Sequence, residues 1–109
     1  MAGTEKSSFD KADQVVELEH GQMRAVRLAD GSALWLSEFT PGWSWESDLA
    51  SPGAGSCPMT HREYVIAGSI RYVMDDGSET VAGAGECLFI APGHRAWVDG
   101  DEICVLLDW

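Results

Sequence analysis

Basic residues are scarce in this 109-residue chain, which has seven Lys and Arg against 18 Asp and Glu and a formal net charge of -11. Binding to the phosphates of a nucleic acid requires Lys and Arg side chains that neutralise them. Attraction to an anionic membrane surface requires clusters of the same residues. We therefore expect no nucleic acid and no membrane among its partners, and we expect the acidic surface to serve solubility.

Long apolar runs are missing as well, so the sequence predicts neither a transmembrane helix nor a signal peptide. There are only three cysteines, Cys57, Cys87 and Cys104. Their odd number and wide spacing exclude a disulfide framework. The simplest compartment is a reducing cytoplasm. We expect Cys87 and Cys104 to pack as small apolar residues in a core.

A convincing amphipathic helical pattern is also absent. Short segments of β-type pattern alternate with turn pairs such as Pro41-Gly42, Asp76-Gly77 and Pro92-Gly93. Many short strands joined by glycine-containing turns predict an all-β sandwich or barrel. The polar residues 1–13 are expected to form a loosely ordered arm, and residues 14–109 a single β-barrel domain.

The second half of the chain resembles the cupin superfamily of small barrels. Residues 64–68, Tyr-Val-Ile-Ala-Gly, are similar to the end of the first cupin motif. Gly85-Glu86 and Pro92-Gly93-His94 stand where the second motif begins and ends, and the Asp76-Gly77 turn lies between the two motifs. The resemblance implies a cupin-type double-stranded β-helix, also called a jelly-roll barrel, over residues 14–109.

The ligand pattern departs from that of the family, which uses three His and one Glu. Counted back from Gly68, the Glu position is occupied by His61, the second His position by Cys57 and the first by a glycine. The last His position is Ala96, and His94 lies two residues earlier, on the same face of an extended strand. The inward candidates that remain are Cys57, His61 and His94.

The pattern is most similar to a little-characterised bacterial branch of small cupins. That branch shares a Trp-x-Trp pair, a Cys-x-x-x-His motif, a Pro-Gly-His motif and an Asp-Gly hairpin. Here these are Trp43 with Trp45, Cys57 with His61, the turn before His94, and a turn at residues 76–77. The branch implies no settled reaction.

One thiolate and two imidazoles form a donor set that suits Zn²⁺ and also holds Fe²⁺, Co²⁺ or Ni²⁺. We therefore predict a divalent metal site made by Cys57, His61 and His94, with a coordination position left open. Glu63 shares the nominal strand face of His61, so we predict it as the catalytic general base, or as a fourth ligand unless a bulge turns it away.

Each of these residues also has an ordinary structural role. A cysteine in a β-barrel is commonly a small core residue, and a histidine in a strand commonly forms hydrogen bonds within the core. Only their joint occurrence within two cupin motifs favours the metal site. His20, beside Gly21, is expected to be a solvated turn residue.

Three apolar side chains are predicted to contact a substrate, namely Trp43, Trp45 and Met59. The two indoles either wall a pocket at the barrel mouth or fill the core or an interface. Trp97 points away from His94 by strand parity and is expected to pack. The small-residue segment 48–56 is expected to be a flexible loop that can act as a lid.

Two classes of function follow from this pattern. The first is a metal-dependent enzyme, a lyase, isomerase, cyclase or oxygenase, acting on a small organic substrate that bears a carbonyl or carboxylate. The second is a non-catalytic module that senses a ligand or a metal, and a metal-free structural dimer is a third alternative. We expect a homodimer, because the apolar segment 102–109 or an open sheet edge would otherwise be exposed.

Overall fold

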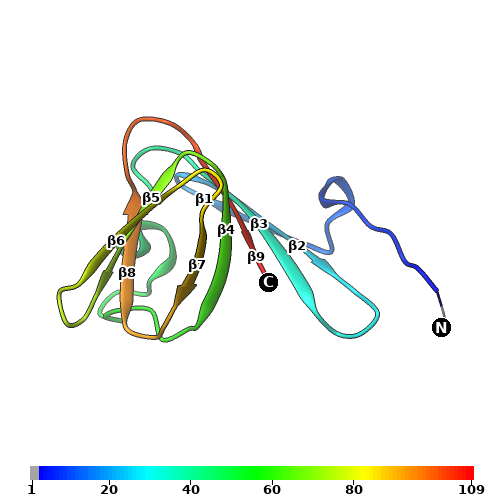
Figure 1. The fold of residues 1–109 in the computed structure, drawn as a ribbon, viewed down its shortest axis with the longest axis horizontal. Helices are drawn as coiled ribbons and strands as arrows, with labels where there is room; N and C mark the ends of the chain where they lie inside the picture. Colours follow the sequence, from blue (N-terminus) through cyan, green and yellow to red (C-terminus); the bar gives the residue numbers. More distant parts are fainter. Residues whose placement is uncertain (1–2) are drawn as a thin grey trace.

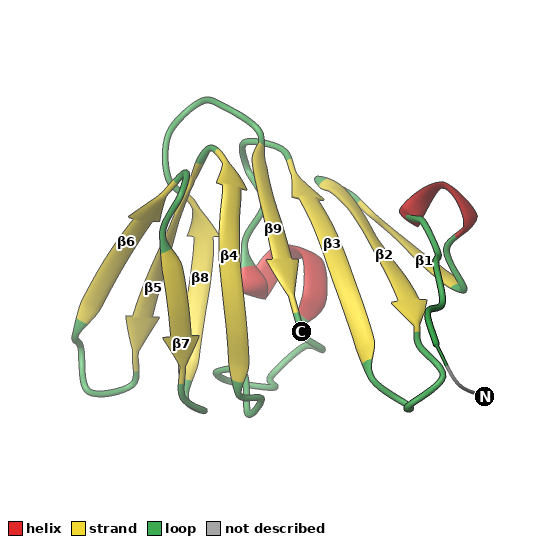
Figure 2. Ribbon diagram, turned by 45° about the vertical axis from the view of Figure 1, so that its right-hand side comes forward, coloured by secondary structure: helices red, strands yellow, loops and turns green. Residues whose placement is uncertain are grey.

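The structure is a computed structural model and describes residues 3–109. Two antiparallel sheets face each other, a larger one of order β1-β2-β3-β9-β4-β7 and a smaller one of order β6-β5-β8 (Figures 1 and 2). The strands are β1 (Gln14–Leu18), β2 (Gly21–Arg27), β3 (Ala33–Phe39), β4 (His61–Ala67), β5 (Ser69–Met74), β6 (Glu79–Gly83), β7 (Cys87–Ile90), β8 (His94–Val98) and β9 (Cys104–Asp108). Two short helical turns are η1 (Phe9–Lys11) and η2 (Trp45–Leu49). The all-β prediction is confirmed.

Gly68 carries the chain from the larger sheet to the smaller one, between β4 and β5. Its φ is +73°, and a Cβ at this position would lie 2.3 Å from the carbonyl oxygen of Ile103. Only glycine fits this conformation and this close approach. The glycine that ends the 64–68 motif is therefore needed where the two sheets meet.

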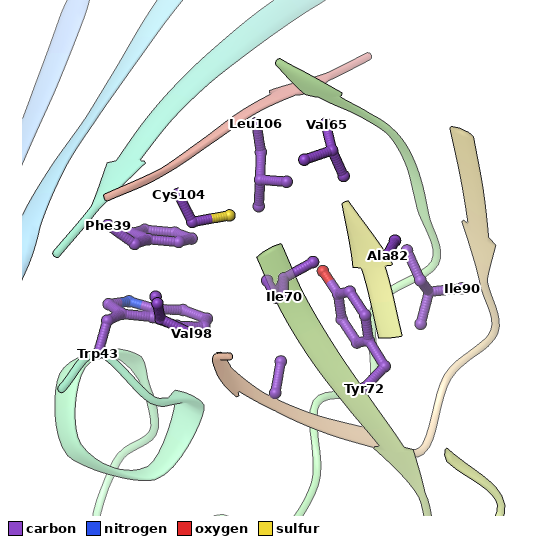
Figure 3. Packing of buried hydrophobic residues seen from close by; sticks show 11 residues of the cluster. Phe39, Trp43, Val65, Ile70, Tyr72, Ala82, Ile90, Val98, Cys104 and Leu106 are labelled. Atoms are coloured by element: carbon purple, nitrogen blue, oxygen red, sulfur yellow. The ribbon is translucent and has the colours of Figure 1, made fainter. Parts of the chain in front are cut away.

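The hydrophobic core fills the space between the two sheets (Figure 3). Val65 and Leu106 from the larger sheet and Ile70 from the smaller one are each at most 1% exposed. The rings of Phe39 and Trp43 stack with centroids 3.9 Å apart and an interplanar angle of 7°. Where β4 and β8 begin and β9 ends, His61, His94 and Asp108 add polar side chains to this largely apolar interior.

Two expectations about local structure are wrong. Cys87 is exposed rather than part of the core, because it lies on β7 with its side chain directed away from the interior. Segment 48–56 is not wholly a loop, since Asp48 belongs to the helical turn η2 and its side chain is fully buried. The boundary of the predicted arm stays a prediction; β1 begins at Gln14, and Arg24 donates a hydrogen bond of 3.2 Å to the carbonyl oxygen of Phe9.

No helix formed by residues 3–109 has the length and apolarity needed to cross a membrane.

Candidate metal centre

A short backbone bridge brings Cys57 beside His94. The amide of Cys57 donates to the carbonyl oxygen of His94, and the amide of Gly93 donates to the carbonyl oxygen of Cys57, both at 2.8 Å. His61 is the first residue of β4 and His94 the first residue of β8. One ligand atom from each of Cys57, His61 and His94 lies within 4.8 Å of the other two. The structure thus brings all three predicted ligands together.

The spacing of these atoms suits a tetrahedral metal ion. Zinc bonds to sulfur and imidazole nitrogen imply donor atoms roughly 3.5 Å apart at the corners of a tetrahedron. The Sγ of Cys57 lies 3.8 Å from Nε2 of His61. Nδ1 of His94 donates to the carbonyl oxygen of Ala91 at 2.7 Å, which leaves its Nε2 with a free lone pair. Cys57 and His94 are both buried.

Asp108, the last residue of β9, orients the imidazole of His61. Its Oδ2 lies 2.8 Å from Nδ1 of His61, so Nε2 faces Cys57. A carboxylate behind a histidine is typical of metal sites, where it holds the ring and raises its basicity. The hydrogen bond that His61 donates to Asp108 raises the pKa of His61 to about 9, against the effect of burial. Metal binding must therefore displace a proton from this ring.

Glu63 stands next to the metal ligands and is buried. It lies directly opposite Asp108 in the pairing of β4 with β9, and it accepts a hydrogen bond from the hydroxyl of Tyr72 on β5. Burial raises the pKa of Glu63 to about 7, and the charge of Asp108 acts in the same direction. Burial likewise raises the pKa of Tyr72 well above its usual value and lowers that of His94. The carboxyl group of Glu63 therefore faces the site rather than being turned away by a bulge, which occurs later, between Val65 and Ala67.

A second group of donors, His61, Glu63 and Asp108, also clusters within 4.8 Å. The two groups share His61, whose Nε2 lies near Cys57 and whose Nδ1 is hydrogen-bonded to Asp108. In the second group Nδ1 would have to bind the ion, although it already forms the hydrogen bond to Asp108. The Cys57, His61 and His94 group is therefore the better candidate for holding an ion, because it leaves the hydrogen bond between His61 and Asp108 intact.

Cys57, His61 and His94 line a cavity of about 360 Å³. All three predicted substrate contacts, Trp43, Trp45 and Met59, line it, and Met59 is 59% exposed. The indole nitrogen of Trp45 donates to the carbonyl oxygen of Gly55 at 2.8 Å, which holds this ring against the loop after η2. Trp97 does not line the cavity and is 38% exposed.

The sequence analysis missed several residues of the cavity, above all Asp108 and Tyr72. Asp108 has the same strand parity as the buried Leu106, so an acidic residue on the inward face of an apolar strand was the available signal. Tyr72 likewise has the same strand parity as Ile70, the other buried residue of β5. Apolar walls were missed too, and they come from β2 and β3: Met23, Trp35 and Phe39.

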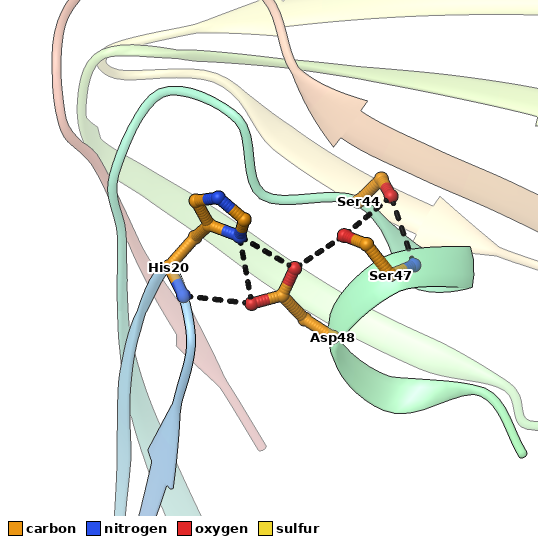
Figure 4. Close-up of polar contacts among 4 residues, drawn as sticks. All are labelled: His20, Ser44, Ser47 and Asp48. Carbon is orange, nitrogen blue, oxygen red and sulfur yellow. Dashed lines mark hydrogen bonds and ion pairs between the residues drawn. The ribbon is translucent and has the colours of Figure 1, made fainter.

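His20 is not a solvated turn residue, so that expectation is wrong (Figure 4). Its amide donates to Oδ2 of Asp48 at 2.8 Å, and its Nδ1 lies 2.9 Å from Oδ1 of the same carboxylate. The hydroxyl of Ser47 also donates to Asp48. The β1–β2 turn therefore anchors η2, the turn from which Trp45 and Leu49 reach the cavity.

No protein-family model matches the sequence, and no curated protein matches it. Solved structures do match. The polyketide cyclase RemF from Streptomyces resistomycificus is similar over 97% of this chain and 78% of its own, with a TM-score of 0.66 and 22% identity. A Rhizobium leguminosarum protein of unknown function is similar over 98% and 95%, with a TM-score of 0.67 and 14% identity. Oxalate decarboxylase from Bacillus subtilis has a TM-score of 0.61 and 24% identity, covering 88% of this chain and 26% of the enzyme.

These likenesses confirm the cupin-type jelly-roll fold. The chain spans about a quarter of the length of the oxalate decarboxylase chain that it matches. At sequence identities of 14% to 24%, the likeness shows the fold alone.

Proposed function

We propose that this protein binds one divalent metal ion through Cys57, His61 and His94 and uses it to transform a small organic molecule. The observation that supports the proposal is the convergence of these three donors at the inner end of an open cavity, with Asp108 behind His61. Zinc suits this donor set, and Fe²⁺, Co²⁺ and Ni²⁺ are alternatives. When bound, the ion would polarise a substrate oxygen or activate a water molecule.

The protein's own residues would bind the substrate and move a proton. Trp43, Trp45 and Met59 would hold the substrate against the metal end of the cavity. Two carboxyl groups of residues 3–109 line the cavity, and Asp108 is hydrogen-bonded to the proposed ligand His61, which leaves Glu63 as the one that is neither a proposed ligand nor hydrogen-bonded to one. Tyr72 holds it in place. We therefore propose Glu63 as the group that takes a proton from the substrate or returns one to it.

Similarity to a polyketide cyclase and to an oxalate decarboxylase supports a lyase or cyclase type of reaction without naming the substrate. Both reaction types place charge on a carbonyl or carboxyl oxygen, which a metal ion stabilises. A binding module without turnover is the alternative, and it would hold both the metal and the ligand but release the ligand unchanged.

The decisive experiment measures metal content by plasma mass spectrometry on untagged protein, with Cys57→Ser, His94→Ala and the exposed Cys87→Ser as a matched control. We expect near-stoichiometric metal in the wild type and in Cys87→Ser, and its loss in the other two variants while circular dichroism is unchanged. A wild type that purifies without metal and takes up no added zinc would contradict the proposal.

We also propose that two copies pair through the outer face of the larger sheet. Tyr64, Ile66 and Phe89 are 38%, 47% and 71% exposed on its outward side. They continue across β9 to the half-buried Leu107, which pairs with Tyr64. An apolar row of this kind on a sheet is a common site of association between identical subunits.

A further inference from the structure

Among residues 3–109, the cavity has two carboxyl groups and no Lys or Arg side chain; its basic groups are the imidazoles of His61, which is hydrogen-bonded to Asp108, and His94. Its lining residues include Glu63 and Asp108, and no Lys or Arg of the described chain is among them. Sites that select carboxylates or phosphates commonly place an Arg fork or a Lys ammonium against the anion. This cavity offers an anionic ligand no such partner.

Three arginines in strands of the barrel, Arg24, Arg71 and Arg95, form ion pairs with acidic partners outside the cavity. Among the described residues, the shortest ion pairs of arginine are Arg24 with Glu38 at 2.6 Å, Arg71 with Glu79 at 2.9 Å and Arg95 with Glu46 at 3.0 Å. The chain as a whole has a formal charge of -11. Both the local and the long-range field therefore disfavour the approach of an anion.

A bound metal ion would not reverse this balance. The two positive charges of a divalent ion would be matched by the thiolate of Cys57 and the carboxylate of Asp108 beside His61. The occupied centre would then carry no net positive charge, even before Glu63 is counted. A dianion gains little at such a centre, whereas a neutral oxygen donor pays no comparable desolvation cost.

The remaining walls are flat and apolar. Indole and phenyl rings come from β3 and the segment after it, and thioethers come from β2 and the chain before β4; the residues are Trp35, Phe39, Trp43, Trp45, Met23 and Met59. Trp43 is held parallel to Phe39, so its ring is fixed in orientation. A volume of about 360 Å³ lies at the small end of the range for ligand cavities.

We infer that the site selects an uncharged, planar, largely apolar molecule with one oxygen donor at its edge, such as a phenol or an enol, over carboxylates and dicarboxylates of similar or smaller size. The lining has two carboxyl groups and no Lys or Arg from the described part of the chain, and the charge of His61 is matched by that of Asp108, so the lining disfavours anions. The aromatic walls bind the flat face. This inference rests on the proposed function for the role of the oxygen donor, but the charge preference belongs to the cavity itself.

The test is isothermal titration calorimetry with three probes, 2-naphthol, 2-naphthoate and oxalate, on zinc-loaded and on zinc-free wild type at pH 7.5. The first two probes share a ring system and differ in charge. We expect 2-naphthol to bind at least tenfold more tightly than 2-naphthoate, and oxalate to give no measurable heat. Tighter or equal binding of 2-naphthoate or oxalate, or no binding of 2-naphthol, would overturn the inference.

Metal content measured on the same samples separates the two proposals. A protein that holds no zinc but still prefers 2-naphthol refutes the proposed metal centre and leaves the charge preference standing. A protein that holds zinc and prefers 2-naphthoate refutes the charge preference and leaves the proposed metal centre standing.

Two lysine variants test the electrostatic cause. Met59→Lys places a cation at the cavity mouth, whereas Val81→Lys places one at a similarly exposed position on β6, outside the cavity. We expect Met59→Lys to reduce the preference for 2-naphthol over 2-naphthoate by about threefold, which is the size of a partly screened charge interaction. Val81→Lys should leave the ratio unchanged. An unchanged ratio in Met59→Lys, or an equal change in both variants, would refute the electrostatic explanation.

Discussion

Replacing Asp108 with Asn tests how the metal centre is supported. Asp108 is not one of the three proposed ligands, but its Oδ2 lies 2.8 Å from Nδ1 of the proposed ligand His61. Asparagine has nearly the same shape and its amide oxygen can still accept the Nδ1 hydrogen. The variant therefore removes the negative charge while it leaves an acceptor in place.

We expect this change to weaken zinc binding. Loss of a carboxylate partner behind a metal-bound histidine commonly lowers metal affinity by about 10- to 100-fold. The side chain of Asp108 is 21% exposed, so water already screens part of its charge. The expected loss is therefore near the lower bound, about tenfold, which corresponds to about 1.4 kcal/mol.

Zinc affinity is measured by titration in competition with a chromophoric chelator, on the wild type, Asp108→Asn and Asp101→Asn. Asp101 lies in the exposed loop before β9, so its variant changes the net charge equally without touching the centre. Thermal melting without metal establishes that Asp108→Asn is folded. Unchanged zinc affinity in Asp108→Asn, or the same loss in Asp101→Asn, would refute the assigned role.

Three further predictions concern stability and assembly. Trp43→Ala should lower the free energy of unfolding in urea by about 3–5 kcal/mol. Trp43→Phe should lower it by much less, because phenylalanine keeps a ring and removes a buried indole N–H that has no partner. Equal losses in the two variants would contradict this. Burial of the Asp48 carboxyl group acts to raise its pKa, but hydrogen bonds from Ser47 and His20 outweigh this effect and lower the pKa. Asp48→Asn should therefore cost about 1–3 kcal/mol at pH 7, with the difference from wild type shrinking below about pH 4 as the native carboxylate is protonated; a pH-independent difference would contradict it. Phe89→Glu should convert a dimer into a monomer in analytical ultracentrifugation, and an unchanged sedimentation coefficient would exclude this face.

The fold could be predicted from local signals because each turn is determined by a few neighbouring residues. Gly68 combines a positive φ with close backbone contact, and the Asp76-Gly77 pair closes the β5–β6 hairpin. The short helical turn η2 could not be predicted in this way. It is held by the contact of Asp48 with His20, which lies 28 residues earlier, and no local pattern reports such a contact.

The candidate site was accessible from the sequence only in part. Cys57 and His61 are four residues apart, so they could be grouped with each other, and the turn before His94 placed that residue by its motif. Asp108 lies 47 residues after His61, and Tyr72, although only nine residues after Glu63, lies on the other sheet. Their roles depend on which strands pair, and the pairing of β4 with both β7 and β9 is a property of the whole barrel.

One end of the barrel holds fully buried apolar residues, and the other end holds the candidate site. Three side chains near Gly68 are buried from solvent and do not line the cavity: Val65, Ile70 and Leu106. At the other end, the same strands β4 and β9 supply His61 and Asp108, which line an open space. The two sets share strands but lie at different ends of them. We therefore expect substitutions at the closed end to act on ligand binding only through global unfolding. Substitutions at the open end should change binding while the core stays intact.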